Sequence, residues 1–551
     1  MARHNFRGGR ERPPLPPFNP QPAKVFKFKI EKILGSLYLI KPLLEKMDIQ
    51  AIVDSIVPNR KENGQILTTG EVTEILVANR LHYPLPLRDI ELWADLCGID
   101  KLFAVESNNL NDDRLARALD DLNEYYQEIM TALALHVIQE FDLKPEEVLW
   151  DTTSIYFEGD YDEAEIVKFG YGDKSDLKQI KLALNIDKNS GVPLRGDVVP
   201  GNLNDPTIVL KNLKKLRQQL NKEELLFTGD NAMGTIPNCL LLHHNKFHFV
   251  APCPASSLFE QAISSVTPEE LDECVFLDKD GTPKFKVTER GVYIDSVDRK
   301  KKEELKDVSP FWARCLIIWS KSKAKLEWER REKYMLQIEK RLTDIALTKL
   351  NIRRYKNKEY AQNQVDKCFQ GPKSYLREIF ANPTVKEKDG LLELVYTIDA
   401  KSLADLEKRD GLYPVVTNVY DHEKYSTQEL FKITRKKYSV EQPMRYLKSK
   451  IKVRPVFLHI EERIKGLTLV TFIALMAYCI LEHLAKQNIN TKATTHQLMK
   501  MFASIIFTEG QMLDGTYFNT VVNVKEQHIH LINKLGLAIG SYGVLSKIQL
   551  E

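Results

Sequence analysis

Two aspartates stand where an isolated carboxylate is costly. Asp151 lies within the segment "EVLWDTTSIYF", which consists mostly of apolar and β-branched residues. Asp230 directly follows "LLFTG", which begins with a short apolar run. An ionised side chain in such surroundings needs a compensating partner. At roughly 4 Å and an effective dielectric constant near 20, two carboxylates repel each other by about 4 kcal/mol, which demands a cation or a proton. Because hard oxygen ligands suit Mg²⁺, the pair predicts a site for a divalent metal ion.

A third acid is available much later in the chain. In "YSTQELFKITRKKYSVEQPMRYLKSK", Ser426 and Glu429 are spaced as a helix-capping box, and Glu441, Arg445 and Lys448 follow at intervals of four and three residues. This spacing places the last three on one face of a helix. An acid that binds metal would then have two cations beside it to hold phosphates. An exposed face of ordinary ion pairs is the alternative interpretation.

Other titratable residues are weaker candidates for a functional site. His244 and His248 have the spacing of metal ligands on a helix, with His243 beside them, but a strand expected from Phe247 breaks that helical face. Asp197 and Asp205 are interpreted as a strand-face residue and a helix cap.

The elements that must position the acids follow an α/β order. Strands are predicted over 147–157, 180–187 and 192–200, then a helix from Asp205, a strand over 224–230, a short helix and a strand over 247–253. Three strands, helix, strand, helix, strand is the order of an RNase H-like mixed sheet with helices on both faces. The first and fourth strands of that sheet are neighbours, so Asp151 and Asp230 are expected to meet.

The whole chain of 551 residues is long enough for several domains, and its 43% hydrophobic and 28% charged residues are typical of globular proteins. Residues 1–24 form a basic, Pro-rich tail, and 25–145 form a mostly helical domain that could bind DNA. The core is predicted in two parts, 146–253 and, with C-terminal helices, 426–551. Between them, residues 254–425 are interpreted as an α+β insertion domain.

The insertion contains a strongly basic helix. Its segment 321–356 has twelve Lys or Arg against five acids, although the net charge of the whole chain is only +3. Affinity for nucleic acid must therefore come from local clusters such as this one, for which Arg330, Arg331 and Lys333 are the candidate DNA contacts. A solvated helix with ordinary ion pairs is the alternative interpretation.

The setting is predicted to be a reducing cytoplasm, because the seven cysteines are scattered and contain no CxxC pair. The start of the chain has no apolar core of a signal peptide. The most apolar stretch, 466–485, approaches the length of a membrane span. We interpret it as a buried helix because Thr468, Thr471 and Glu482 interrupt it, so no membrane is expected as a partner.

Together these residues resemble the DDE transposases of bacterial and archaeal insertion sequences, in the branch with a β-rich insertion between the second Asp and the Glu. The resemblance spans most of the chain. It rests on four blocks: "DTTS" around Asp151, "GYGDKSDLKQIKLALNIDKNSGVPLRGDVVPGNLNDPTIV" (170–209), "GDNAM" around Asp230, and "VEQPMRYLKSKIKVRPVFLHIEERIKG" (440–466).

The resemblance implies a catalytic, metal-binding triad of Asp151, Asp230 and Glu441, with Lys448 as the basic residue seven positions after the Glu. The family's Tyr and Arg before the Glu are replaced by Thr434 and Lys437, so Lys437, Arg445 and Lys448 become the expected DNA contacts beside the site. Pro443 is a further departure, which a helix starting just before Glu441 would accommodate in its first turn.

The activity implied is two-metal phosphoryl transfer with Mg²⁺, for which Mn²⁺ can substitute: cleavage at the terminal inverted repeats, followed by attack of the freed 3′-OH on target DNA. A homodimer that joins two ends is expected, in the cytoplasm on the nucleoid. Two alternatives remain at this point. One is an RNase H-like nuclease without strand transfer, and the other is a decayed transposase that binds DNA without cutting it.

Overall fold

In the computed structural model, the chain divides into two compact units, Met1–Asp54 with Pro58–Arg117 and Leu484–Glu551, and Ser55–Val57 with Ala118–His483. The structure describes residues 26–58, 66–170, 176–254, 256–295, 303–435, 441–449, 451, 458–490, 492–513 and 515–538, without the side chains of residues 26–28 and 441. The unit boundary at Arg117 lies upstream of the boundary at 145 that the sequence predicts, and the last residues join the N-terminal unit.

The first unit combines helices with a three-stranded antiparallel sheet. Helix α3 (Thr69–His82) is capped by Thr68, which forms a capping box with Glu71. The sheet consists of β1 (Phe26–Ile33), β14 (Ile506–Met512) and β15 (Tyr517–Val522), in the order β1-β14-β15. The expectation of helices alone at the C-terminal end was therefore wrong. The other helices are α1 (Leu37–Lys46), α2 (Ile49–Ile56), α4 (Ile90–Leu96), α5 (Ile99–Leu102), α6 (Asp112–Glu124), α18 (Thr495–Met501) and α19 (Glu526–Lys534).

The second unit is built on a ten-stranded mixed sheet, which contains the predicted RNase H-like core. A meander of β2 (Glu147–Phe157), β4 (Lys178–Asp187) and β5 (Pro193–Pro200) is followed by β6 (Leu226–Thr228) and β7 (His248–Pro252), both parallel to β2. The order β5-β4-β2-β6-β7 places the first and fourth core strands side by side, as expected. The short β3 (Lys168–Phe169) also pairs with β4.

The inserted strands continue this sheet instead of forming a separate domain. After β7 the order runs β13 (Leu412–Thr417), β10 (Phe311–Ser320), β9 (Pro283–Ile294) and β8 (Val275–Leu277), all antiparallel to their neighbours. The pairing of β13 with β7 covers the edge that β7 would otherwise expose.

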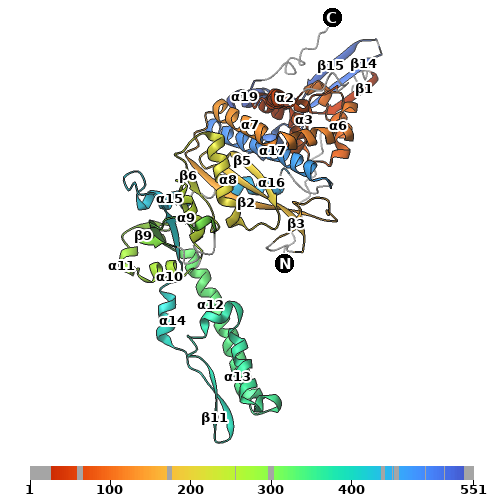
Figure 1. The fold of residues 1–551 in the computed structure, drawn as a ribbon. Helices are drawn as coiled ribbons and strands as arrows, with labels where there is room; N and C mark the ends of the chain where they lie inside the picture. The colour runs from red at the N-terminus through yellow and green to blue at the C-terminus, as the bar shows by residue number, and fades with distance from the viewer. Residues whose placement is uncertain are drawn as a thin grey trace, which may run out of the picture. The chain divides into compact units, whose positions relative to one another are not determined.

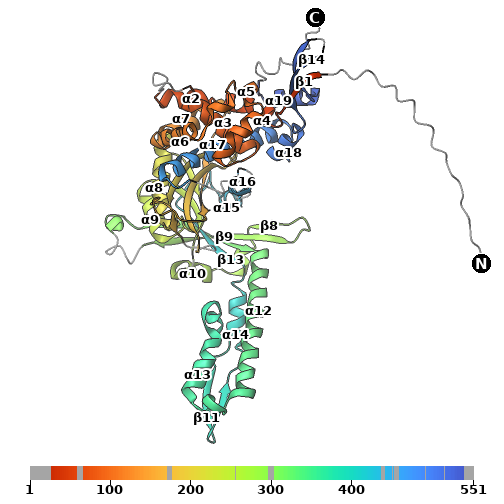
Figure 2. The ribbon, with the colours of Figure 1, turned by 90° about the vertical axis from the view of Figure 1, so that its right-hand side faces the viewer.

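Helices cover both faces of the sheet (Figure 2). One face carries α8 (Asp205–Leu220) and α9 (Ile236–His244) over a core that includes the fully buried Trp150 and Phe227. The other carries α15 (Thr427–Arg435) and α16 (Glu441–Ser449). The remaining helices of this unit are α7 (Tyr126–Glu140), α10 (Ser257–Ser264), α11 (Pro268–Leu271) and most of α17 (Glu461–Asn488).

A helical appendage, residues 321–410, extends from the sheet between β10 and β13 (Figure 1). It has its own apolar core, in which Ile338, Leu342 and Phe380 are fully buried. The long basic helix is shorter than predicted, because α12 (Lys321–Asp344) passes into a π-helix (Ile345–Lys349) and then a 3-10 turn (Arg353–Lys356). Its other elements are α13 (Lys358–Asp366), the hairpin β11 (Thr384–Lys388) and β12 (Leu391–Val395), and α14 (Ala400–Glu407).

Helix α17 is long and apolar enough to cross a membrane, but 94% of its most apolar window is buried inside the protein. This burial agrees with the predicted core helix. Thr468 and Thr471 donate hydrogen bonds to backbone carbonyls one turn earlier, which satisfies their hydroxyl protons inside the core.

Candidate active site

Asp151 is held in the middle of a central strand. Strand β2 is bonded to β4 on one side and to β6 on the other, and Asp151 lies opposite Leu184 of β4. Its side chain is half-buried, and its Oδ1 accepts a hydrogen bond from the backbone N–H of Thr152 at 2.8 Å. The position of this carboxylate is therefore determined by the pairing of the sheet.

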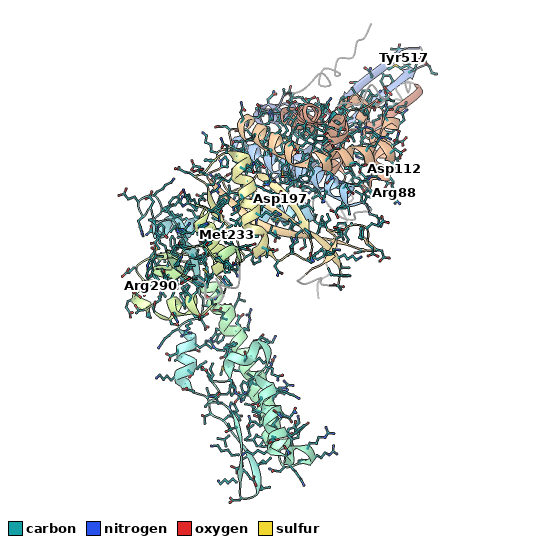
Figure 3. The ribbon with its side chains drawn as sticks, in the orientation of Figure 1. Arg88, Asp112, Asp197, Met233, Arg290 and Tyr517 are labelled. Atoms are coloured by element: carbon teal, nitrogen blue, oxygen red, sulfur yellow. The ribbon has the colours of Figure 1, made fainter. Side chains whose placement is uncertain are left out.

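Asp230 follows β6 by two residues, at the start of a tight turn. Its Oδ1 accepts a hydrogen bond from the N–H of Ala232 at 2.9 Å, and its carbonyl accepts one from Met233 at 3.2 Å. A Cβ at Gly229 would lie 2.8 Å from the Met233 Cε atom, so a larger residue beside the acid would displace the end of that side chain. Met233 itself is fully buried in the core (Figure 3). The short motif "GDNAM" therefore forms a turn that holds the Asp230 carboxylate in place.

The strand register brings the two aspartates to equivalent positions. β2 and β6 are parallel, and Leu149 pairs with Thr228. Neighbouring strands lie about 4.8 Å apart, and a step of two residues returns a side chain to the same face. Two residues beyond that pair stand Asp151 and Asp230. The register fixes the residues just before the two acids, and the encounter of Asp151 with Asp230 stays a prediction.

The helix that starts at Glu441 packs on this same face. Across the strands, Asp151, Leu184 and Gly196 follow one another in register. A Cβ at Gly196 would lie 2.7 Å from the ring of Phe472, so α17 lies directly on this face. Helix α16 in turn contacts α17 through Tyr446, whose hydroxyl donates a hydrogen bond to Oε2 of the buried Glu482 at 2.6 Å.

Helix α16 accommodates the departures seen in the sequence. It begins at Glu441, so Pro443 is its third residue and replaces an N–H that needs no partner within the helix. Met444 and Leu447 are buried, whereas Arg445 and Lys448 are exposed, as predicted for a face that presents cations. The side chain of Glu441 and the whole of Lys437 lie outside the described residues.

The carboxylates of Asp151 and Asp230 are suitable ligands for a hard divalent cation. Two carboxylates on adjacent strands supply oxygen ligands of the kind that Mg²⁺ prefers. Within the described residues, no group of three or more His, Cys, Asp or Glu side chains could hold a metal ion. A third ligand must therefore come from beyond them, and the side chain of Glu441 is the candidate. His244 and His248 do not share a helical face, because His244 ends α9 and His248 begins β7.

A cavity of about 560 Å³ is lined by residues close in sequence to the two acids, although neither acid lines it. Leu149, Thr228 and Gly229, which precede the aspartates, line it. So do the cations Lys188, Lys323 and Arg435, which sequence reasoning missed because three distant segments supply them. Lys188 and Lys323 already pair with Glu147 and Glu327, at 3.8 Å and 2.6 Å, so the cavity is not assigned a ligand.

The remaining polar candidates have structural roles. Asp197 is a buried strand residue whose Oδ1 pairs with Arg195 at 2.7 Å, and Asn212 donates a hydrogen bond to its Oδ2 at 2.7 Å (Figure 3). Asp205 is the first residue of α8 and pairs with Lys181 at 2.7 Å. Its predicted role as the helix cap is taken by Asn204.

The predicted DNA contacts on α12 divide into two kinds. Arg330 and Lys333 are exposed, as a DNA contact requires. Arg331 is only 1% exposed, and its guanidinium pairs with Asp410 at 2.7 Å. The assignment of Arg331 to DNA binding is therefore wrong. Its helical position faces the core of the protein, where a buried cation needs a carboxylate.

An RNase H-like sheet with one aspartate on β2, a second in the turn after the adjacent β6, and α16 on the same face is the architecture expected of a nucleic-acid phosphoryl transferase. The family model described as "Transposase DDE domain" matches residues 142–477, more than half of the chain, so the chain belongs to the DDE transposase family. Members of this family cut and join DNA and normally use divalent metal ions. Residues 29–135 match a second model, "Domain of unknown function (DUF4277)".

Comparisons with curated proteins and with solved structures do not identify individual residues. No curated protein matches the chain. Among solved structures, a cryo-EM structure of a piggyBac transposase synaptic complex with hairpin DNA is similar with a TM-score of 0.35 and 9% sequence identity. The match covers 86% of this chain and 80% of that chain. The likeness is too remote to assign individual residues.

Proposed function

We propose that this chain binds the terminal inverted repeats of its own element and catalyses cleavage and strand transfer with Asp151, Asp230 and Glu441. The observation that carries the proposal is the parallel pairing of β2 with β6, in which Leu149 lies opposite Thr228, each two residues before one of the aspartates. Joining two ends in one complex requires two active sites, so the proposal includes a homodimer and a target DNA.

The roles of the chain's own groups follow from their positions. Asp151 on β2 and Asp230 in the turn after β6 would offer oxygen ligands, and Glu441, the first residue of α16, would be the third ligand. Arg445 and Lys448, both exposed, hold the phosphates on either side of the reacting bond, with Lys437 as a third contact. Two Mg²⁺ ions, or Mn²⁺ in their place, would supply an activated water and stabilise the leaving 3′ oxygen when bound.

The test is divalent-metal-dependent nicking of a duplex that contains the inverted repeats flanking the coding region. Glu441→Gln is expected to slow nicking by at least about a thousandfold, because loss of a metal ligand removes several kcal/mol of transition-state stabilisation. Glu462→Gln is the matched control, since Glu462 is an exposed acid at the start of α17. Nicking that survives in Glu441→Gln contradicts the assignment of this residue.

The same assay separates the rival functions. Pre-cut ends and a target plasmid test strand transfer, and a simple nuclease would nick DNA without producing joined products. A decayed transposase that only binds DNA would show equal, absent nicking in the wild type and in Glu441→Gln. Thr434 favours this second candidate, because it stands where the family has a Tyr and donates its hydroxyl hydrogen bond to the Phe431 carbonyl at 2.7 Å.

A further inference from the structure

The far end of α12 leads into a cluster of cations that no motif identifies. We name residues 349–358 the distal basic loop. It contains the π-helix end, the 3-10 turn and the first residue of α13. Half of its ten residues are cations and none is acidic: Lys349, Arg353, Arg354, Lys356 and Lys358.

Most of these cations have no carboxylate partner, whereas several cations of α12 do. Along α12, Lys323 pairs with Glu327 at 2.6 Å and Lys325 with Glu329 at 3.8 Å. Lys349 likewise pairs with Asp344 at 2.5 Å. In the described part of the chain, no acid lies within ion-pair distance of the other four loop cations, all of which are exposed: Arg353, Arg354, Lys356 and Lys358. Four like charges held close together are costly without a counterion.

Specific contacts hold the loop in shape. The Asn351 side chain donates a hydrogen bond to the Leu392 carbonyl at 2.9 Å and accepts one from the Leu392 N–H at 2.8 Å. Asn351 and Arg353 both have positive φ, 65° and 47°, a strained conformation for residues other than glycine. Asn357 caps α13 by accepting a hydrogen bond from the Tyr360 N–H at 2.8 Å. The cations are therefore presented by an ordered turn anchored to β12.

The length of α12 sets the distance from the loop to the acids. Helix α12 begins beside the catalytic strands, because Ser320 and Lys323 line the same cavity as Thr228 and Gly229. Its 24 residues span about 36 Å at 1.5 Å per residue. One turn of B-DNA is also about 34–36 Å long.

We infer that the distal basic loop binds the phosphate backbone of duplex DNA about one helical turn from the bond that is cut. The inference rests on the proposed function, and it moves the main DNA contact of the appendage from α12 to the loop. The contact is independent of base sequence, since exposed cations neutralise phosphates and release counterions. The contact of the distal basic loop extends the DNA-binding surface beyond the catalytic face.

The test compares two double variants of the full chain that each remove two positive charges. Arg353→Gln/Arg354→Gln changes the loop. Lys325→Gln/Lys408→Gln changes two cations elsewhere on the appendage that already pair with Glu329 and Asp405. Affinity for a duplex of about 40 base pairs of arbitrary sequence is measured against salt concentration. The loop variant is expected to lower the slope of log K against log salt by about 1.8, from about 0.9 per phosphate contact, and the control to leave it unchanged.

A second substrate separates this inference from the proposed function. On a duplex ending about five base pairs beyond the cut, well short of one turn, the loop variant and the wild type are expected to nick equally. A wild-type salt slope in the loop variant, with nicking intact, overturns the inference and leaves the proposed function standing. A wild type that neither binds nor nicks overturns both. If the first loop variant has a lower melting temperature than the wild type, Arg354→Gln/Lys356→Gln repeats the test.

Discussion

In the core sheet, Arg195 and Asp197 stand two residues apart on β5, with side chains only 3% and 5% exposed. At the far end of the appendage, Arg353 and Arg354 are exposed, and no carboxylate of the described chain pairs with them. Arg331 resembles Arg195, because it is buried on α12 and paired with a carboxylate, Asp410. The comparison teaches that the role of a cation follows from its burial and its partner. The number of basic residues in a segment does not decide it.

The largest expected effect is in the core sheet. Arg195→Met leaves Asp197 buried without its main cation, and breaking such a pair is expected to cost about 4 kcal/mol of stability. Lys215→Met is the matched control, because Lys215 approaches the same carboxylate at 3.5 Å but is 40% exposed, so about 0–1 kcal/mol is expected. Hydrogen exchange of β5 and α8 measures both. Equal losses for the two variants would remove the distinction between buried and exposed pairs.

The neighbours Arg330 and Arg331 give the second test, with a smaller effect. Arg331→Met is expected to destabilise the appendage by about 3 kcal/mol, because its partner Asp410 retains some exposure, 15% for the side chain. Arg330→Met changes an exposed residue and is expected to stay within about 0.5 kcal/mol. Hydrogen exchange of α12 and α14 reports the difference. Destabilisation by Arg330→Met alone would reverse our assignment of the two arginines.

The stability of Arg331→Met is also expected to depend on pH. Burial raises the pKa of Asp410, and the hydrogen bond from Arg331 opposes that rise. Without Arg331 the folded-state pKa of Asp410 rises further above its unfolded value, so the protonated form stabilises the variant at low pH. That stability is complete below the unfolded pKa and is lost as the pH rises through the folded pKa. The deficit of Arg331→Met should therefore shrink on acidification, which urea unfolding at two pH values can check.

The sequence predicts the core well because its signals are local. Alternation of apolar residues identifies 147–157 as a strand, and β2 has these bounds. Strand order then follows from the RNase H-like connectivity, which places Asp151 beside Asp230. Long-range partners cannot be predicted this way. Asp410 pairs with a residue 79 positions earlier, and β14 pairs with β1 from the opposite end of the chain.

The position of Glu441 depends on packing in a similar way, and this gives the smallest expected effect. No strand register fixes α16, which is joined to α17 by Tyr446 and the buried Glu482. Burial raises the pKa of the Tyr446 hydroxyl, and its hydrogen bond to Glu482 raises that pKa further, so the group stays protonated and donates. Tyr446→Phe removes this donor from a buried acid and is expected to cost about 2 kcal/mol.

A double-mutant cycle decides whether this contact positions the third acid. Glu482→Gln in the Tyr446→Phe background should cost less than Glu482→Gln alone, because the amide replaces a carboxylate that has already lost its donor. If the contact only stabilises α16, binding and nicking should follow the folded fraction and recover at lower temperature. If it positions Glu441, nicking should fall about tenfold at full folding while DNA affinity stays unchanged, since about 1.4 kcal/mol of transition-state stabilisation is then lost. Additive costs across the cycle would show that the two side chains do not cooperate, and α16 would have to be held by Met444 and Leu447 alone.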